Sequence, residues 1–162
     1  MKRWQDVVRT AIDLYRSKRV AYLYGAFGET GSDILVDRLW SQYPEHYKKY
    51  VTDRGHTKQE LKLHVRGKQC FDCSGFVSYC LGLGYHANSD ALRKMATDTT
   101  TPKNGYWGQM LWKKGHVGID FFGYVLECVS EFNDLQWNYI SDRDFTESCQ
   151  MWCVDYTNSS RW

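Results

Sequence analysis

The chain has 162 residues, of which 43% are apolar and 16% are aromatic, and its formal net charge is +2. This length favours one domain with a substantial core, and the apolar content argues against a disordered chain. A mean hydropathy of −0.59 and the lack of a long apolar run exclude a transmembrane span. The small net charge gives no argument for nucleic-acid binding.

The first residues, Met1 to Trp4, resemble the basic start of a signal peptide. Asp6, Arg9 and Asp13 interrupt any apolar segment after it. We therefore expect a chain that is made in the cytosol without a signal peptide.

Near the start, apolar residues recur every three or four positions, which predicts an amphipathic helix that ends near Ser17. An extended piece and a turn follow at 22–25. Residues 27–67 read as a helical segment, because Ser32 and Thr57 are suitable helix caps and Pro44 suits a first helical turn.

Three histidines, His46, His56 and His64, lie in this segment. Their spacing matches no metal motif, and we interpret them as solvated or packing residues. The aromatic content of residues 27–67 suggests that this segment packs on the rest of the domain and forms a wall of a substrate groove.

The segment 70–81 is the centre of the sequence. Apolar residues at helical spacing predict a helix that begins at or just before Cys73, with Asp72 as its N-cap and Gly82 beyond its end. A thiol in the first turn lies where unpaired N–H groups and the helix dipole lower its pKa. Such a thiolate is a nucleophile if a base lies beside it.

His116 is the expected base. It begins a predicted strand at 116–122, and a tight turn leads to a second strand at 124–129. Antiparallel pairing would bring Glu127 close to His116, where a carboxylate orients the imidazole. Glu131 and Asn133 are alternative orienting residues if the hairpin is irregular.

His86 is the other histidine that follows the predicted nucleophile helix. Helical rise puts it roughly 20 Å from Cys73, and we reject it as the base on that ground. A short helix at 91–96 and an irregular polar stretch at 97–106 follow.

Strands dominate from Gln109 onward, at 110–112, 117–122, 124–129, 135–140 and 151–156. Helices first and antiparallel strands afterwards indicate an α+β fold, with N-terminal helices packed on a sheet of about five strands. Residues 158–162 read as a loose tail.

The runs Asp72-Cys73-Ser74-Gly75-Phe76 and Gly115-His116-Val117-Gly118-Ile119 resemble motifs of the NlpC/P60 family of papain-like cysteine peptidases. The run Ala21-Tyr22-Leu23-Tyr24-Gly25-Ala26 resembles the segment before the nucleophile in that family. The resemblance covers nearly the whole chain. Relative to the shortest family members, residues 27–67 form an insertion, and a longer version of this region also occurs in members from Firmicutes and their phages.

The resemblance implies a papain-like fold in a single catalytic domain, 1–162, that cleaves peptide stems of bacterial cell walls. It implies Cys73, His116 and Glu127 as the catalytic residues and Tyr22, Asp72 and Ser74 as substrate-binding residues. In the family, the residues at the positions of Asp72 and Ser74 help to bind the amine end of the substrate. Glu127 is a departure, because most members have His, Asn or Gln there, while Glu occurs in the Firmicute and phage branch and in CHAP amidases.

Three functions stay open. The first is an endopeptidase that cuts a γ-D-glutamyl–diamino-acid bond, and the second is a CHAP-like N-acetylmuramoyl-L-alanine amidase. The third is a non-catalytic wall-binding or phage structural component. We expect peptidoglycan as the partner of a monomer, reached by release or delivery, as for a phage endolysin, a phage tail component or an intracellular hydrolase.

We expect neither a metal nor a cofactor. The six cysteines should be reduced in the cytosol. Cys70 and Cys73 with Cys149 and Cys153 would allow a four-thiolate zinc site, but the second pair has loose spacing. The zinc site is therefore an alternative that we do not favour.

Overall fold

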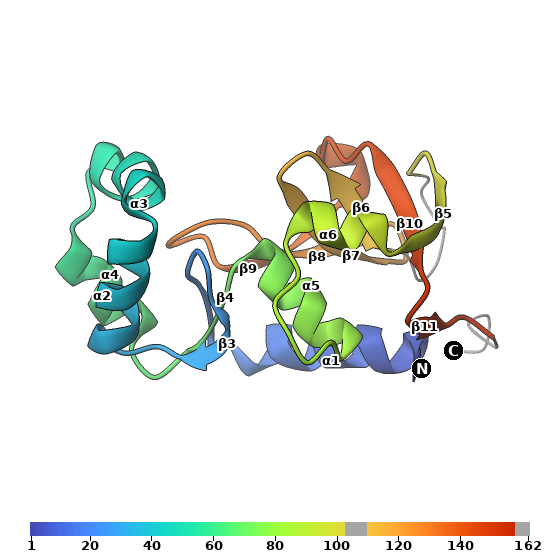
Figure 1. The fold of residues 1–162 in the computed structure, drawn as a ribbon, viewed down its shortest axis with the longest axis horizontal. Coiled ribbons are helices and arrows are strands. Elements are labelled where there is room, and N and C mark those ends of the chain that lie inside the picture. The colour runs from blue at the N-terminus through green and yellow to red at the C-terminus, as the bar shows by residue number, and fades with distance from the viewer. Residues whose placement is uncertain (103–109, 158–162) are drawn as a thin grey trace.

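A computed structural model describes residues 1–102 and 110–157 of the chain. Its architecture is α+β, with helices packed against a six-stranded antiparallel sheet (Figure 1). The sheet has the strand order β5-β10-β6-β7-β8-β9. Its strands are β5 Ala96–Thr100, β6 Met110–Lys113, β7 His116–Phe121, β8 Tyr124–Cys128, β9 Leu135–Tyr139 and β10 Glu147–Met151.

Two differences from the predicted sheet concern its polar strands. β5 lies where the sequence predicts irregular structure; its threonines are β-branched and suit an exposed edge strand, which apolar alternation does not reveal. The strand predicted at 151–156 is instead β10, which ends at Met151, followed by β11, Val154–Asp155. β11 pairs with β1, Lys2–Arg3. Part of the stretch predicted as irregular and the predicted tail at 158–162 lie outside the described residues.

Two helices that lie far apart in the sequence cover one face of the sheet. α1, Trp4–Ser17, and α5, Cys73–Leu81, both pack against β7 and β8. Trp4, Val77 and Leu126 belong to the core that they enclose. The short helix α6, Ser89–Lys94, packs on α5. This arrangement fixes the start of α5 over the sheet.

The insertion forms a separate lobe, at the left of Figure 1. It contains α2 Asp33–Gln42, α3 Pro44–Tyr50, a 3-10 turn at Thr52–Arg54 and α4 Lys58–Val65. Ser32 caps α2, and Thr57 and Glu60 form a capping box on α4. The lobe has its own core, which includes Leu39, Tyr47 and Leu61.

The start of the insertion is not helical. Residues 27–30 form β3, Phe27–Thr30, which pairs with β4, Gln69–Phe71; β4 also pairs in parallel with β2, Val20–Tyr22. These strands form a three-stranded sheet beside the lobe. Only Asp72 separates the end of β4 from the start of α5.

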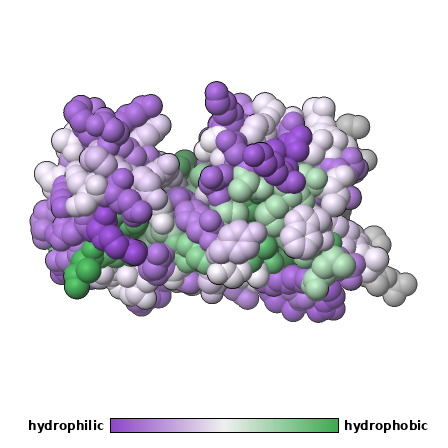
Figure 2. Space-filling view, in the orientation of Figure 1, coloured by the Kyte–Doolittle hydropathy of each residue, from purple (hydrophilic) through white to green (hydrophobic). Residues whose placement is uncertain are grey.

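The loop 129–134 between β8 and β9 extends toward the insertion lobe and is drawn in orange in Figure 1. In Figure 2 the upper outline of the molecule is indented between the lobe and the rest of the chain, and the visible face of the lobe is mostly hydrophilic. Of the helices that the structure describes, none has both the length and the apolar character that a membrane span requires.

Candidate active site

Cys73 is the first residue of α5. The side chain of the N-cap, Asp72, accepts a hydrogen bond from the backbone N–H of Gly75 at 2.6 Å. A Cβ atom on Gly75 would lie 2.3 Å from the carbonyl oxygen of Ala26, closer than packed atoms approach. Glycine at this position therefore lets the start of α5 pack against the turn before β3.

The thiol of Cys73 lies against the residues on either side of His116. Its Sγ atom is 3.9 Å from the carbonyl oxygen of Gly115, and the backbone N–H of Val117 also bonds to it. Cys73, His116 and Tyr22 line one cavity of about 270 Å³. The structure thus brings the predicted nucleophile and base to the same cavity.

His116 bonds to Glu127 across the β7–β8 hairpin. The distance from His116 Nε2 to Glu127 Oε2 is 2.6 Å. Ile119 pairs with Leu126, so Glu127 lies opposite Gly118 and diagonal to His116 on the same face. A Cβ atom on Gly118 would lie 2.5 Å from Val125 Cγ2 and 3.3 Å from Glu127 Cβ, so glycine makes room for the carboxylate.

Among the hydrogen bonds of the described residues, none joins His116 to either of the alternative orienting residues, Glu131 and Asn133. Glu131 pairs with His46 at 2.8 Å, and Asn133 donates to the hydroxyl of Ser130. The hairpin is regular up to Cys128, which leaves both residues in the loop beyond it.

Two further residues hold Glu127, and the sequence analysis missed both. Asn138 Nδ2 on β9 donates to Oε1 at 3.0 Å, and Arg143 Nη2 donates to Oε2 at 3.0 Å. The Nε atom of Arg143 also lies 2.7 Å from Oε1. Only Asn138 had a signal in the sequence. It lies two residues after Gln136 on a predicted strand, so these two polar side chains share one face of the strand.

The carboxylate of Glu127 is fully buried. Burial tends to raise its pKa, but the hydrogen bonds from His116, Arg143 and Asn138 outweigh that effect and hold the pKa below its usual value. Glu127 is therefore an ionised acceptor that can stabilise a positive charge on His116.

The acidity of Cys73 differs from the sequence-based expectation. Burial raises the pKa of the thiol to about 12, and the charge of Asp72 adds to this; backbone N–H groups of Val117, Ser74 and Cys73 offset part of the effect. The expected lowering by the helix N-terminus is therefore the smaller influence. Cys73 rests as a thiol, and a base must remove its proton before it can attack.

Tyr22 is 5% exposed and lines the cavity that contains Cys73 and His116. Its phenol pKa lies well above the usual value because of burial first and then the proximity of Cys73. A neutral hydroxyl beside the thiol can donate a hydrogen bond, so Tyr22 has the chemistry that the resemblance assigns to it.

Asp72 and Ser74 line a second cavity, of about 430 Å³, which Cys73 also lines. The hydroxyl of Ser74 donates to Asp72 Oδ1 at 3.0 Å. Asp72 and Ser74 thus line a cavity at Cys73, as expected for substrate-binding residues, whose role stays a prediction. Tyr24 and Gly115 line both cavities.

His86 also lines this second cavity, and its expected distance from Cys73 is wrong. Its Nε2 atom lies 3.0 Å from Asp72 Oδ1 and 3.0 Å from the hydroxyl of Ser74. Gly82 takes a left-handed conformation, with φ of 76°, and ends α5. The chain then returns along the helix, with the N–H of Ala87 donating to Ser78, rather than continuing along the helix axis.

The three histidines of the insertion pack, and all three contact the β8–β9 loop. His46 pairs with Glu131, His64 pairs with Asp134 at 2.8 Å, and the His56 ring stacks on Phe132. The lobe therefore holds the loop between the strands that carry Glu127 and Asn138.

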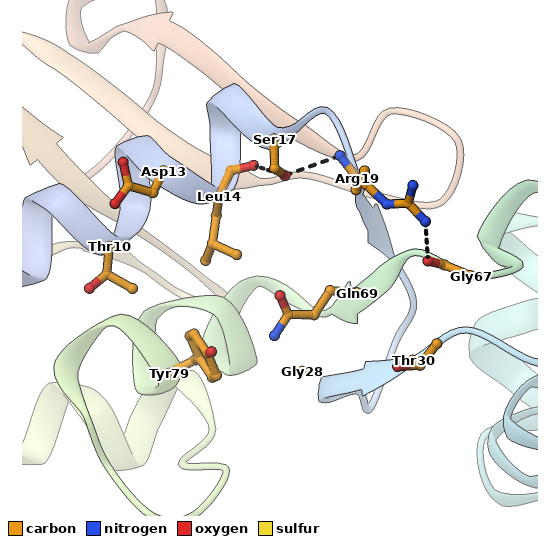
Figure 3. Close-up of a pocket in the computed structure, with 10 residues that line it drawn as sticks. All are labelled: Thr10, Asp13, Leu14, Ser17, Arg19, Gly28, Thr30, Gly67, Gln69 and Tyr79. Carbon is orange, nitrogen blue, oxygen red and sulfur yellow. Dashed lines mark hydrogen bonds between the residues drawn. The ribbon is translucent and has the colours of Figure 1, made fainter.

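A larger cavity, of about 580 Å³, lies between α1, α5 and the three-stranded sheet (Figure 3). Asp13 and Arg19 are its charged lining residues, and Arg19 is bonded to the carbonyl oxygen of Gly67. It shares no lining residue with the two cavities at Cys73 and contains neither cysteine nor histidine.

The described residues contain no group of three or more His, Cys, Asp or Glu side chains placed to hold a metal ion. All six cysteines are free thiols, and the cysteines of the alternative zinc site lie on different elements.

Comparison with known proteins does not assign the chain to a family: no family model matches it, and no curated protein matches its sequence.

Proposed function

We propose that this protein is a cysteine peptidase of the NlpC/P60 type, with a papain-like fold, that hydrolyses amide bonds in the peptide stems of peptidoglycan. The observation that carries the proposal is the arrangement around Cys73. A thiol at a helix N-terminus shares a cavity with His116, whose Nε2 atom is bonded to buried Glu127. Nucleophile, base and orienting acid come from a helix and two strands, in the order that the resemblance implies.

In the proposed reaction, His116 takes the proton of the Cys73 thiol as Sγ attacks the carbonyl carbon of the amide. Because Nε2 is bonded to Glu127, Nδ1 is the ring nitrogen that accepts this proton. The backbone N–H of Cys73 and the Tyr22 hydroxyl stabilise the oxyanion. His116 then protonates the leaving amine, the C–N bond breaks, and water releases the acid and restores the thiol.

The proposed order of reaction steps gives each of the two cavities at Cys73 a role. The leaving amine receives its proton from His116, so it lies in the cavity that His116 and Tyr22 line. The acyl part of the substrate stays bonded to Cys73 and lies in the cavity that Asp72, Ser74 and His86 line.

The bond that we favour is the γ-D-glutamyl–diamino-acid bond. The alternative is an N-acetylmuramoyl-L-alanine amidase, with which Glu127 is equally compatible because CHAP amidases also carry Glu at this position. Mass spectrometry of defined muropeptides after digestion separates the two. The endopeptidase releases peptides that begin with the diamino acid, and the amidase releases whole stems that begin with alanine.

A further inference from the structure

His86 lines a cavity at Cys73, and the proposed reaction does not use it. Its Nε2 atom is 3.0 Å from Asp72 Oδ1, and its ring stacks on Phe27 with a centroid distance of 5.9 Å. The His86 side chain is 26% exposed, against 7% for Asp72. A substrate in the cavity therefore meets the imidazole rather than the carboxylate.

The carboxylate of Asp72 already has partners on both oxygens. Oδ1 accepts from the N–H of Gly75 at 2.6 Å, from the hydroxyl of Ser74 at 3.0 Å and from His86. Oδ2 accepts from the N–H of Gly25 at 3.0 Å. A carboxylate oxygen offers about two lone-pair sites. Oδ1 is therefore saturated, and an ammonium that approached Oδ1 would have to displace one of its three donors.

The charge of the His86–Asp72 pair also disfavours a substrate ammonium in this cavity. The hydrogen bond with Asp72 raises the pKa of His86, and burial opposes it more weakly. An imidazolium paired with the carboxylate makes the pair neutral overall. Among the described residues, the other polar side chains that line this cavity carry no formal charge; they are Tyr24, Tyr43, Ser74, Asn88 and Ser89.

We propose that His86 holds the position beside Asp72 that a substrate ammonium would otherwise take, and that this cavity accepts a peptide segment whose N-terminus is acylated and therefore uncharged. The inference rests on the proposed function for its choice of peptide. It makes His86 a specificity-determining residue: stems still linked through their N-terminus are substrates, and free stems with an N-terminal amine are poor ones.

The test uses two synthetic peptides of the same sequence, L-Ala-γ-D-Glu-L-Lys, one with a free N-terminal amine and one N-acetylated. Calorimetry measures their binding to the full chain carrying Cys73→Ala, with and without His86→Gln. We expect the acetylated peptide to bind about tenfold more tightly when His86 is present, because a charged hydrogen bond has this magnitude. With His86→Gln the preference should fall or reverse.

His86→Asn is a second variant in case His86→Gln does not fold, and His56→Gln is the matched control. His56 pairs with a carboxylate, Glu60, on the surface of the lobe, away from both cavities at Cys73. The control should leave the preference unchanged.

Preference for the free amine, no binding of either peptide, or a preference that survives both His86 substitutions would overturn the inference. The proposed function is judged separately, by cleavage with intact Cys73. If the acetylated peptide binds with the predicted preference but is not cut, the inference about His86 stands and the peptidase proposal fails.

Discussion

Glu127 Oε2 lies 2.6 Å from His116 Nε2, on the diagonal of a hairpin that Gly118 keeps open. A buried carboxylate at this point orients the imidazole ring. Glu127→Gln keeps the size of the side chain but removes its charge. We expect kcat/KM for muropeptide cleavage to fall by about a hundredfold or more.

The matched control for this variant is Glu147→Gln. Glu147 also pairs with an arginine, Arg93, but on β10 and outside both cavities at Cys73. It should retain activity close to that of the unmodified protein. Equal kcat/KM for Glu127→Gln and the unmodified protein would remove Glu127 from the mechanism.

Arg143 stabilises the ionised form of Glu127, so Arg143→Gln should destabilise the fold. We expect a loss of about 2 kcal/mol at neutral pH, since the arginine is partly exposed while its partner is buried. Urea unfolding monitored by circular dichroism measures this loss in the free energy of unfolding.

The pH dependence of that loss has a defined sign. The folded pKa of Glu127 is lowered, so its contribution is complete above the ordinary carboxyl pKa and disappears as the pH falls through the folded value. The difference between the unmodified protein and Arg143→Gln should therefore shrink below about pH 4. A difference that grows on acidification would contradict the assigned role.

Cys73 should depend on His116 for its reactivity. Because burial raises the pKa of the thiol to about 12, Cys73 by itself is protonated at neutral pH. In the proposed reaction, His116 accepts the proton of this thiol. The rate of alkylation by iodoacetamide at pH 7 should fall about tenfold or more in His116→Gln.

The Cys73→Ala variant gives the background from the other cysteines, four of which are buried. Alkylation of Cys73 at the same rate with and without His116 would show that the two side chains do not exchange a proton. It would also favour a non-catalytic component over both hydrolase functions.

Gly75 should not tolerate a side chain. Alanine there would place a Cβ atom 2.3 Å from the Ala26 carbonyl oxygen, and backbone atoms must move to relieve the contact. We expect Gly75→Ala to lower the free energy of unfolding by about 1–3 kcal/mol and to reduce activity by displacing Cys73. Gly84→Ala is the control, because a Cβ atom there meets nothing within 4 Å. Equal melting temperatures for the two variants would refute the close approach at α5.

Local signals predicted the parts of the site that short segments determine. The cap at Asp72 and the glycine at 82 define α5, and α5 is found at Cys73–Leu81. The hairpin pattern brings Glu127 to the same face as His116. The insertion helices follow from Ser32, Pro44 and Thr57, whose capping chemistry is local.

Features that depend on tertiary structure could not be predicted in this way. Arg143 follows β9 in a polar stretch with no periodic pattern, and only the folded sheet brings it to Glu127. The reversal after Gly82 returns His86 to Asp72, against an estimate that assumed a straight path. Burial, which sets the acidity of Cys73, is likewise a property of the whole fold.

The most direct measurement is mass spectrometry of purified peptidoglycan incubated with the unmodified protein and with Cys73→Ala. The proposal predicts new peptide fragments with the unmodified protein, cut at one type of amide bond, and none with the variant. Intact peptidoglycan in both reactions across several wall types, or equal release of fragments by the Cys73→Ala protein, would contradict it.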